Sequence, residues 1–182
     1  MAAFLANISH ETSRSIVGVD GVTTRIPLWY KSELDGQDNC ARYFSVDDTF
    51  PWVAGQCYYG RGPIQLSWNY NYGSVSFIMD GDKTKLLNNP EGLLDNGKKA
   101  FMSALIFWMM PSGAKPSCHD VINTDRGFGK TINVINGGLE CRGNASTDYR
   151  VLDRIGFYRR YLTVLGASTS ESDFDLSCQG MT

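Results

Sequence analysis

The chain has 182 residues, of which 42% are hydrophobic and 20% charged, and its formal net charge is -2. This length allows one domain with a substantial core, and the charge balance excludes a broadly basic nucleic-acid surface. Aromatic residues make up 12% of the chain, many of them Trp and Tyr close to Asn, Gln and Ser. Such a mixture favours a neutral or polar ligand, because these side chains stack on flat faces and hydrogen-bond hydroxyl groups.

The cysteine pattern and the apolar runs indicate in which compartment the protein is expected. No apolar run approaches the roughly 20 residues that span a bilayer, and "MAAFLA" lacks the basic leader of a signal peptide. Five cysteines occur without a CxxC pair, which weakens the zinc and redox interpretations. We expect an extracellular protein with two disulfides and one free thiol, the alternative being five reduced cysteines in a cytosolic protein.

The first predicted helix begins near the N-terminus and ends at about Ser13, and one of its residues is unexpected. Phe4, Ile8, Glu11 and Ser15 share one helical face, so the carboxyl of Glu11 continues the apolar stripe. A glutamate in that position is either a paired structural residue or a working acid. Glycines and a proline then predict an irregular stretch over residues 18–27.

The middle of the chain reads as a loop followed by two helices. Residues 39–55 are polar and aromatic, which predicts a loop. Ser67 is the expected N-cap of a helix that ends at about Met79. The apolar segment 96–110 predicts a central, buried helix whose inward residues are Phe101, Ala104, Leu105 and Trp108.

Two further helices are expected in the last third. One begins at residue 123 or later and ends at Asn136, and the other covers "DYRVLDRIGFYRRYLTVLG", ending at Gly166. Its predicted buried stripe contains Leu152, Ile155, Tyr158, Leu162 and Leu165. We expect the tail beyond Gly166 to be anchored only through Cys178. With no repeat and no interdomain linker, residues 1–182 are expected to form a single domain.

Two glutamates, Glu11 and Glu33, are the candidates for acid and base chemistry. When two carboxyls lie in different surroundings, the one in the apolar setting retains a proton while the solvated one acts as a base. Glycoside hydrolysis needs such a pair. The alternative is that either glutamate forms a structural salt bridge.

Several longer segments carry a family resemblance. "AAFLANISHETS", "YKSEL", "YYGRGPIQLSWNYNYG", "FWMMPSGAKPSCHDVI", "TINVINGGLEC" and "DRIGFYRRYLTVLG" occur in this order between Ala2 and Cys178. Together they resemble the catalytic domain of the family 19 glycoside hydrolases, the plant-type endochitinases. The resemblance implies a mainly α, bilobal, lysozyme-like fold with a deep substrate cleft and a small β-hairpin. It also implies inverting hydrolysis of chitin, the β-1,4-linked N-acetylglucosamine polymer.

The resemblance assigns roles to individual positions. Glu11 in "SHET" matches the general acid, Glu33 in "KSEL" the general base, and Ser67 in "QLS" the residue that helps to hold the attacking water. In an inverting enzyme the two carboxyls should lie about 6.5 to 9.5 Å apart. The expected substrate-binding residues are Gln65, Tyr70, Asn71, Lys115 and Asn136.

A supporting network and the disulfide pairing follow from the same resemblance. His10, Glu140 and Arg154 resemble a hydrogen-bonding and charged network behind the general base. The resemblance pairs Cys40 with Cys57 and Cys141 with Cys178, and leaves Cys118 unpaired. No motif requires a metal or an organic cofactor, since two carboxyls supply both acid and base.

The chain also departs from the family pattern. The family domain normally has several tens of residues ahead of the "AAF" helix, so we expect the N-terminal part of the usual domain to be absent. "SRSIVG" replaces a Gly-Gly-Trp type sequence, and the loop between Cys40 and Cys57 is longer than usual.

The leading hypothesis is a secreted, monomeric endochitinase that binds chitin or its oligosaccharides, without nucleic-acid or membrane partners. One alternative is a catalytically silent chitin-binding relative. Retention of both catalytic carboxyls argues against that alternative. The other is a hydrolase that cleaves peptidoglycan, which also contains β-1,4-linked N-acetylglucosamine.

Overall fold

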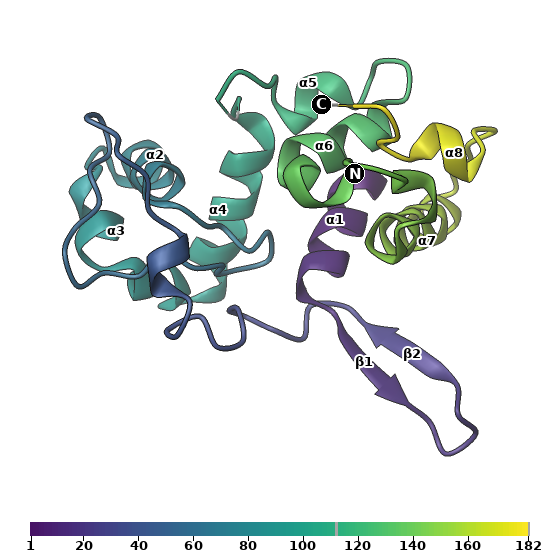
Figure 1. The fold of residues 1–182 in the computed structure, drawn as a ribbon, viewed down its shortest axis with the longest axis horizontal. Coiled ribbons are helices and arrows are strands. Elements are labelled where there is room, and N and C mark those ends of the chain that lie inside the picture. The colour runs from purple at the N-terminus through teal and green to yellow at the C-terminus, as the bar shows by residue number, and fades with distance from the viewer. Residues whose placement is uncertain (112, 182) are drawn as a thin grey trace. The chain divides into compact units, whose positions relative to one another are not determined.

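The computed structural model describes residues 1–111 and 113–181, and its regular structure is mostly helical (Figure 1). The helices are α1 (Ala2–Thr12), η1 (Cys40–Arg42), α2 (Asn69–Asp80), α3 (Thr84–Asn88), η2 (Pro90–Leu94), α4 (Gly97–Met109), α5 (Cys118–Val121), α6 (Gly127–Glu140), η3 (Ala145–Thr147), α7 (Tyr149–Val164) and α8 (Asp173–Leu176), where η marks a short 3-10 helix. The chain divides into two compact units, residues 1–10 with 108–182 and residues 11–107. The expected mainly α class with a small hairpin is confirmed.

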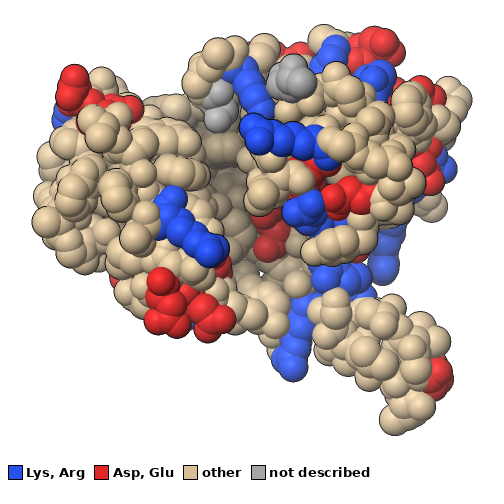
Figure 2. Space-filling view, in the orientation of Figure 1, with Lys and Arg blue, Asp and Glu red and all other residues tan. Residues whose placement is uncertain are grey.

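The turn and second strand of the hairpin lie in the stretch of residues 18–27 that we expected to be irregular. Strands β1 (Arg14–Val17) and β2 (Thr23–Ile26) pair antiparallel, with Arg14 opposite Ile26. The β-branched residues of "SIV" and "TTRI" favour extended backbone, and the glycines between the strands form the turn instead of breaking the structure. No strand residue is fully buried, and Figure 2 shows the largely uncharged surface of the hairpin.

The unit of residues 1–10 and 108–182 is built from α1, α6 and α7, with α5 and α8 packed on α6. Asn7 of α1 donates to Thr131 Oγ1 of α6 at 3.1 Å, and Ser9 shares a 2.8 Å hydrogen bond with Tyr161 of α7. Helices α6 and α7 therefore hold α1 in place through the buried side chains of Asn7 and Ser9.

The buried face of α7 differs from the predicted one. Ile155 and Leu162 are buried as expected, but Leu152 and Leu165 are exposed and Tyr158 is half-buried. The inward face contains Arg154, a fully buried cation. A pattern of apolar residues does not include a buried arginine. The predicted buried stripe of α7 therefore differs from the observed one.

The C-terminal tail has more anchors than Cys178. Arg126 donates to the backbone carbonyls of Asp175, Ser177 and Gln179, at 3.3, 2.9 and 3.0 Å. Ser172 caps α8 through a reciprocal pair of hydrogen bonds with Asp175. The prediction of a tail held only by its disulfide was therefore wrong. Similarly, α6 does not end at Asn136 but kinks there and continues to Glu140.

The unit of residues 11–107 contains the hairpin, the long loop and helices α2 to α4. Helix α4 is not the wholly buried helix that we expected, because Phe101 and Leu105 are exposed while Ala104 and Trp108 are buried. Apart from Trp108, its buried side chains are the small ones of Ala100, Ser103 and Ala104. Because apolar residues occur on all sides of this helix, the sequence pattern could not show which face is buried. Within the described residues, no helix combines the length and apolar character needed to cross a membrane.

Both expected disulfides are present. Cys40 is bonded to Cys57, which closes the long loop, and Cys141 to Cys178, which ties the tail to the end of α6. Cys118 is buried and free, as the resemblance implied.

Candidate functional site

Glu11 lies half-buried in the last turn of α1, next to the buried Thr12. The Thr12 carbonyl accepts hydrogen bonds from the backbone N–H groups of Trp29 and Tyr30, at 3.0 and 2.9 Å. The Thr12 hydroxyl accepts a third, from the Leu28 N–H at 3.1 Å. The end of α1 is therefore attached to the segment that leads directly to Glu33.

A small hollow of about 240 Å³ adjoins this helix end. Thr12, Trp29 and Tyr30 line it together with Gly62 and Pro63 of the "GRGPIQ" segment. The hollow adjoins the end of α1, but none of the predicted site residues lines it.

Glu33 is half-buried, and each of its carboxylate oxygens accepts one hydrogen bond. The Tyr43 hydroxyl donates to Oε1 at 2.8 Å, and the Gly60 N–H donates to Oε2 at 3.2 Å. The Glu33 N–H in turn donates to the Gly60 carbonyl at 2.8 Å, so side chain and backbone are held by the same residue. Since a carboxylate has about four lone-pair sites, this arrangement leaves acceptor capacity for a further donor such as water.

The segment that carries this N–H is held by Arg61, a fully buried cation. Its guanidinium donates to the Cys57 carbonyl and to the Tyr72 hydroxyl, both at 2.8 Å, and also to Glu91. It lies 3.6 Å from the centre of the Tyr59 ring. The hydrogen bond from Arg61 is the main reason that the pKa of Glu91 is lowered, against the effect of burial. Arg61 thus gives the backbone beside Glu33 a fixed conformation.

The predicted residues Gln65, Ser67, Tyr70 and Asn71 lie at and before the start of α2. Ser67 does not cap the helix: Trp68 holds the N-cap position, and the Ser67 hydroxyl donates to the Gln65 carbonyl at 2.9 Å. The Asn71 amide donates to the Ser67 carbonyl at 2.9 Å, so these two residues lie next to each other. Tyr70 stacks on Trp68 with ring centres 6.0 Å apart, and burial raises the pKa of its hydroxyl.

In the other unit, Glu140 and Arg154 form a buried ion pair. Arg154 donates to both oxygens of Glu140, at 2.9 and 2.8 Å, and to Asn7 Oδ1 at 2.9 Å. The Asn136 amide donates to Glu140 Oε1 at 2.8 Å. Burial alone would raise the pKa of Glu140, but the hydrogen bonds and charge of Arg154 outweigh it and lower the pKa. The resemblance correctly linked these two charges, and the structure adds Asn136 to them.

Two further predicted residues have partners in this unit. His10 Nδ1 lies 2.7 Å from Oδ2 of Asp153, the residue that precedes Arg154 in the sequence. Lys115 donates to the carbonyl of Asn133 at 2.6 Å and to its side-chain oxygen at 3.1 Å, and burial lowers the pKa of its amine.

Sequence reasoning missed Tyr43, Arg61 and Asp153, although each contacts a predicted residue or holds its surroundings. Arg61 could have been found, because an arginine between two glycines in "GRG" is unusual in a turn. Tyr43 could not, because its irregular loop has no period. Asp153 is separated from His10 by most of the chain, so no local pattern joins them.

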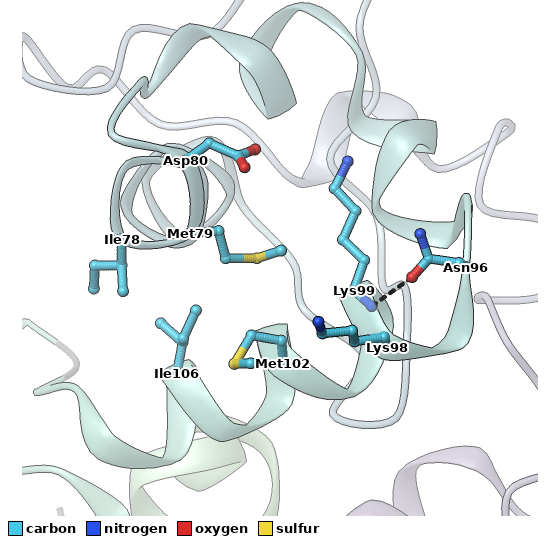
Figure 3. Close-up of a pocket in the computed structure, with 8 residues that line it drawn as sticks. All are labelled: Ile78, Met79, Asp80, Asn96, Lys98, Lys99, Met102 and Ile106. Carbon is cyan, nitrogen blue, oxygen red and sulfur yellow. Dashed lines mark hydrogen bonds between the residues drawn. The ribbon is translucent and has the colours of Figure 1, made fainter.

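A larger hollow, of about 590 Å³, lies elsewhere in the unit of residues 11–107 (Figure 3). Ile78, Met79, Met102 and Ile106 form its apolar part, and Lys98, Lys99, Asn96 and Asp80 surround them. It contains none of the predicted site residues. Volume alone therefore does not identify the site in this chain.

The described residues were also compared with the requirements of a metal site. Metal ions in proteins are usually held by several convergent His, Cys, Asp or Glu side chains. Across residues 1–111 and 113–181, no three such side chains are arranged to hold an ion.

Comparison with known proteins gives one consistent result. The family model described as "chitinase class I" matches residues 1–178. Chitinase 10 of Oryza sativa subsp. japonica is 41% identical, with 98% of this chain and 63% of the relative covered. Endochitinase 3 of Nicotiana tabacum is 44% identical, with 94% and 53% covered. This chain therefore spans between about half and two-thirds of the length of these curated relatives.

Solved structures agree with the sequence comparison. Chitinase C of Streptomyces griseus has a TM-score of 0.73 and 36% identity, with 97% of this chain and 62% of that chain covered. A family GH19, class IV chitinase of Zea mays has a TM-score of 0.72 and 33% identity, with 97% and 72% covered. The lysozyme-like fold that the resemblance implied is thus confirmed.

Proposed function

Because this chain belongs to the chitinase class I family, we propose that it is an endochitinase that hydrolyses β-1,4-linked N-acetylglucosamine polymers with inversion. The observation that carries the proposal is the setting of Glu33. Its carboxylate is half-buried, oriented by one donor on each oxygen, and still able to accept a proton. A glutamate in a structural salt bridge would accept from a cation, whereas the two described donors to Glu33 are neutral.

In the proposed reaction, Glu33 is the general base. It accepts a proton from a water molecule as the water oxygen attacks the anomeric carbon. Ser67 helps to hold this water, a role for which its hydroxyl, already donating to Gln65, remains an acceptor.

Glu11 is the proposed general acid. As the bond between the anomeric carbon and the glycosidic oxygen breaks, Glu11 transfers its proton to that oxygen, and the product has the inverted configuration. Its attachment through Thr12 to the segment before Glu33 supports a joint role for the two carboxyls.

The residues proposed to contact the sugar chain are Gln65, Tyr70, Asn71, Lys115 and Asn136. Tyr70 offers a half-buried ring with a polar edge, and Lys115 a half-buried amine already oriented by Asn133. His10, Glu140 and Arg154 are proposed to support these residues and not to react. The two disulfides support a secreted protein, and we further propose that it acts as a monomer.

The experiment is hydrolysis of a soluble chitin oligosaccharide by the purified chain, with the product anomers identified by NMR. Glu11→Gln and Glu33→Gln should each reduce kcat by roughly 100- to 10,000-fold, because each removes one proton-transfer group. First appearance of α-anomers supports inversion. Binding of the oligomer without cleavage would instead indicate a silent binding protein, and preference for bacterial walls over chitin a peptidoglycan hydrolase.

A further inference from the structure

The long loop between Cys40 and Cys57 is anchored at several points. The disulfide closes its ends, and the fully buried Asn69 holds its middle. The Asn69 amide donates to the carbonyls of Ser45 and Phe50, at 3.0 and 2.7 Å, and its oxygen accepts the Ser45 N–H at 2.8 Å. Side chains near Ser45 therefore have positions that do not depend on Glu33.

Tyr43 is the loop residue that reaches Glu33. Its ring packs edge-on against Trp68, with ring centres 6.0 Å apart and an interplanar angle of 82°. Its hydroxyl donates to Glu33 Oε1 at 2.8 Å. The contact with Trp68 orients the tyrosine ring. The hydrogen bond from its hydroxyl then restricts the orientation of the Glu33 carboxylate.

The protonation of Tyr43 makes it a donor at all working pH values. Burial, followed by the hydrogen bond and charge of Glu33, raises the pKa of Tyr43 to about 12, although Arg42 acts in the opposite direction. A phenol that retains its proton can donate to a carboxylate but cannot compete with it as a base.

Other charges near this segment have different partners. The cations Lys31 and Arg61 both act on Glu91, whose pKa they lower. Among the described residues, the side chain that donates to Glu33 is therefore Tyr43, and the second donor is the Gly60 N–H. One donor on each oxygen limits the directions in which the Glu33 carboxylate can turn.

We propose that Tyr43 is a positioning residue that fixes the orientation of the Glu33 carboxylate. This proposal rests on the proposed function, in which Glu33 is the general base. With Oε1 held by Tyr43 and Oε2 by Gly60, the remaining lone pairs have fixed directions, and one of them can face the attacking water.

The direct test is Tyr43→Phe, which removes only the hydroxyl. We expect kcat to fall roughly 10- to 100-fold, as for loss of a hydrogen bond to a charged group, with KM unchanged. A purely structural role for Tyr43 would instead lower the thermal stability and leave kcat of the folded variant unchanged.

Tyr149→Phe is the matched control, since the Tyr149 side chain is 76% exposed and lies at the start of α7. It should leave kcat and KM unchanged. Thermal unfolding of both variants checks that each is folded. An unchanged kcat in folded Tyr43→Phe, or a loss confined to KM, would overturn the proposal.

A second readout separates this proposal from the proposed function. The carboxyl carbon of residue 33, labelled with ¹³C and assigned by its absence in Glu33→Gln, can be observed by NMR without any substrate. In Tyr43→Phe its resonance should shift, because Oε1 has lost a hydrogen bond. If the unmodified chain hydrolyses no chitin but the resonance shifts, the chitinase proposal fails while the contact of Tyr43 with Glu33 stands. If the resonance stays in place, the Tyr43 proposal fails.

Discussion

Glu33 and Glu140 are the same residue type in two units of the molecule, and their surroundings differ in one decisive respect. Glu140 is 1% exposed and receives two hydrogen bonds from Arg154 and one from Asn136. Glu33 is half-buried and receives one hydrogen bond from a tyrosine and one from a peptide N–H. A carboxylate neutralised by a buried cation holds structure together, whereas a carboxylate oriented by neutral donors keeps its capacity to accept a proton.

The sharpest test is the same substitution at both positions. Glu140→Gln should lower the free energy of unfolding by about 3 to 5 kcal/mol, because it leaves the buried Arg154 without its anion. Glu33→Gln should change that free energy by less than about 1 kcal/mol, since no buried charge loses its counter-ion. Urea unfolding of the two variants measures both. Equal losses of unfolding free energy in the two variants would show that Glu33 and Glu140 do not differ in their structural role.

The disulfides extend the comparison to the loops around each glutamate. Replacing Cys141 and Cys178 by Ala opens a separation of 37 residues, and replacing Cys40 and Cys57 one of 17. The expected losses of stability are about 4 and about 3 kcal/mol. Only the Cys40→Ala, Cys57→Ala variant should also lower kcat under conditions in which both variants are folded, because its loop carries Tyr43. A similar loss of kcat in both would show that the loop has no special link to Glu33.

The pH dependence of stability provides a smaller effect. The pKa of Glu140 is lower in the folded protein than in the unfolded chain, where it is about 4.3. The ionised carboxylate therefore makes its full contribution to the free energy of unfolding above the unfolded pKa, and this contribution is lost as pH falls through the folded pKa. The stability difference between the unmodified chain and Glu140→Gln should therefore shrink from pH 7 towards pH 2. Urea unfolding across this range tests it. A difference independent of pH would mean that the charge of Glu140 is not what stabilises the fold.

The smallest expected effect concerns Cys118. Burial raises the pKa of this thiol to about 12, so its reactive thiolate is scarce near neutral pH. Iodoacetamide at pH 8 should leave the folded chain unmodified and its activity unchanged, and should label Cys118 only after unfolding. Mass spectrometry of the native and urea-treated chain measures this. Rapid labelling of the native chain would place the thiol at the surface.

Much of the local structure could be predicted from the residues themselves. The apolar stripe of α1, the stop at Gly166 and the motifs around Glu11 and Glu33 are local features, and the structure retains the corresponding helices. The errors share one cause. Ser67 as a cap, Leu152 as a core residue and a buried Phe101 were each inferred from one segment alone, whereas packing between segments determined the outcome.

The sequence by itself determined the family, the helical class, the disulfide pairing through the resemblance, and the identity of the two candidate carboxyls. These depend on residue types in order along the chain. Only the tertiary structure decided which partners each carboxyl has, because Tyr43 reaches Glu33 from an irregular loop and Arg154 reaches Glu140 from another helix. Hydrogen bonds act over about 3 Å between groups that can lie far apart in sequence, so no local pattern encodes them.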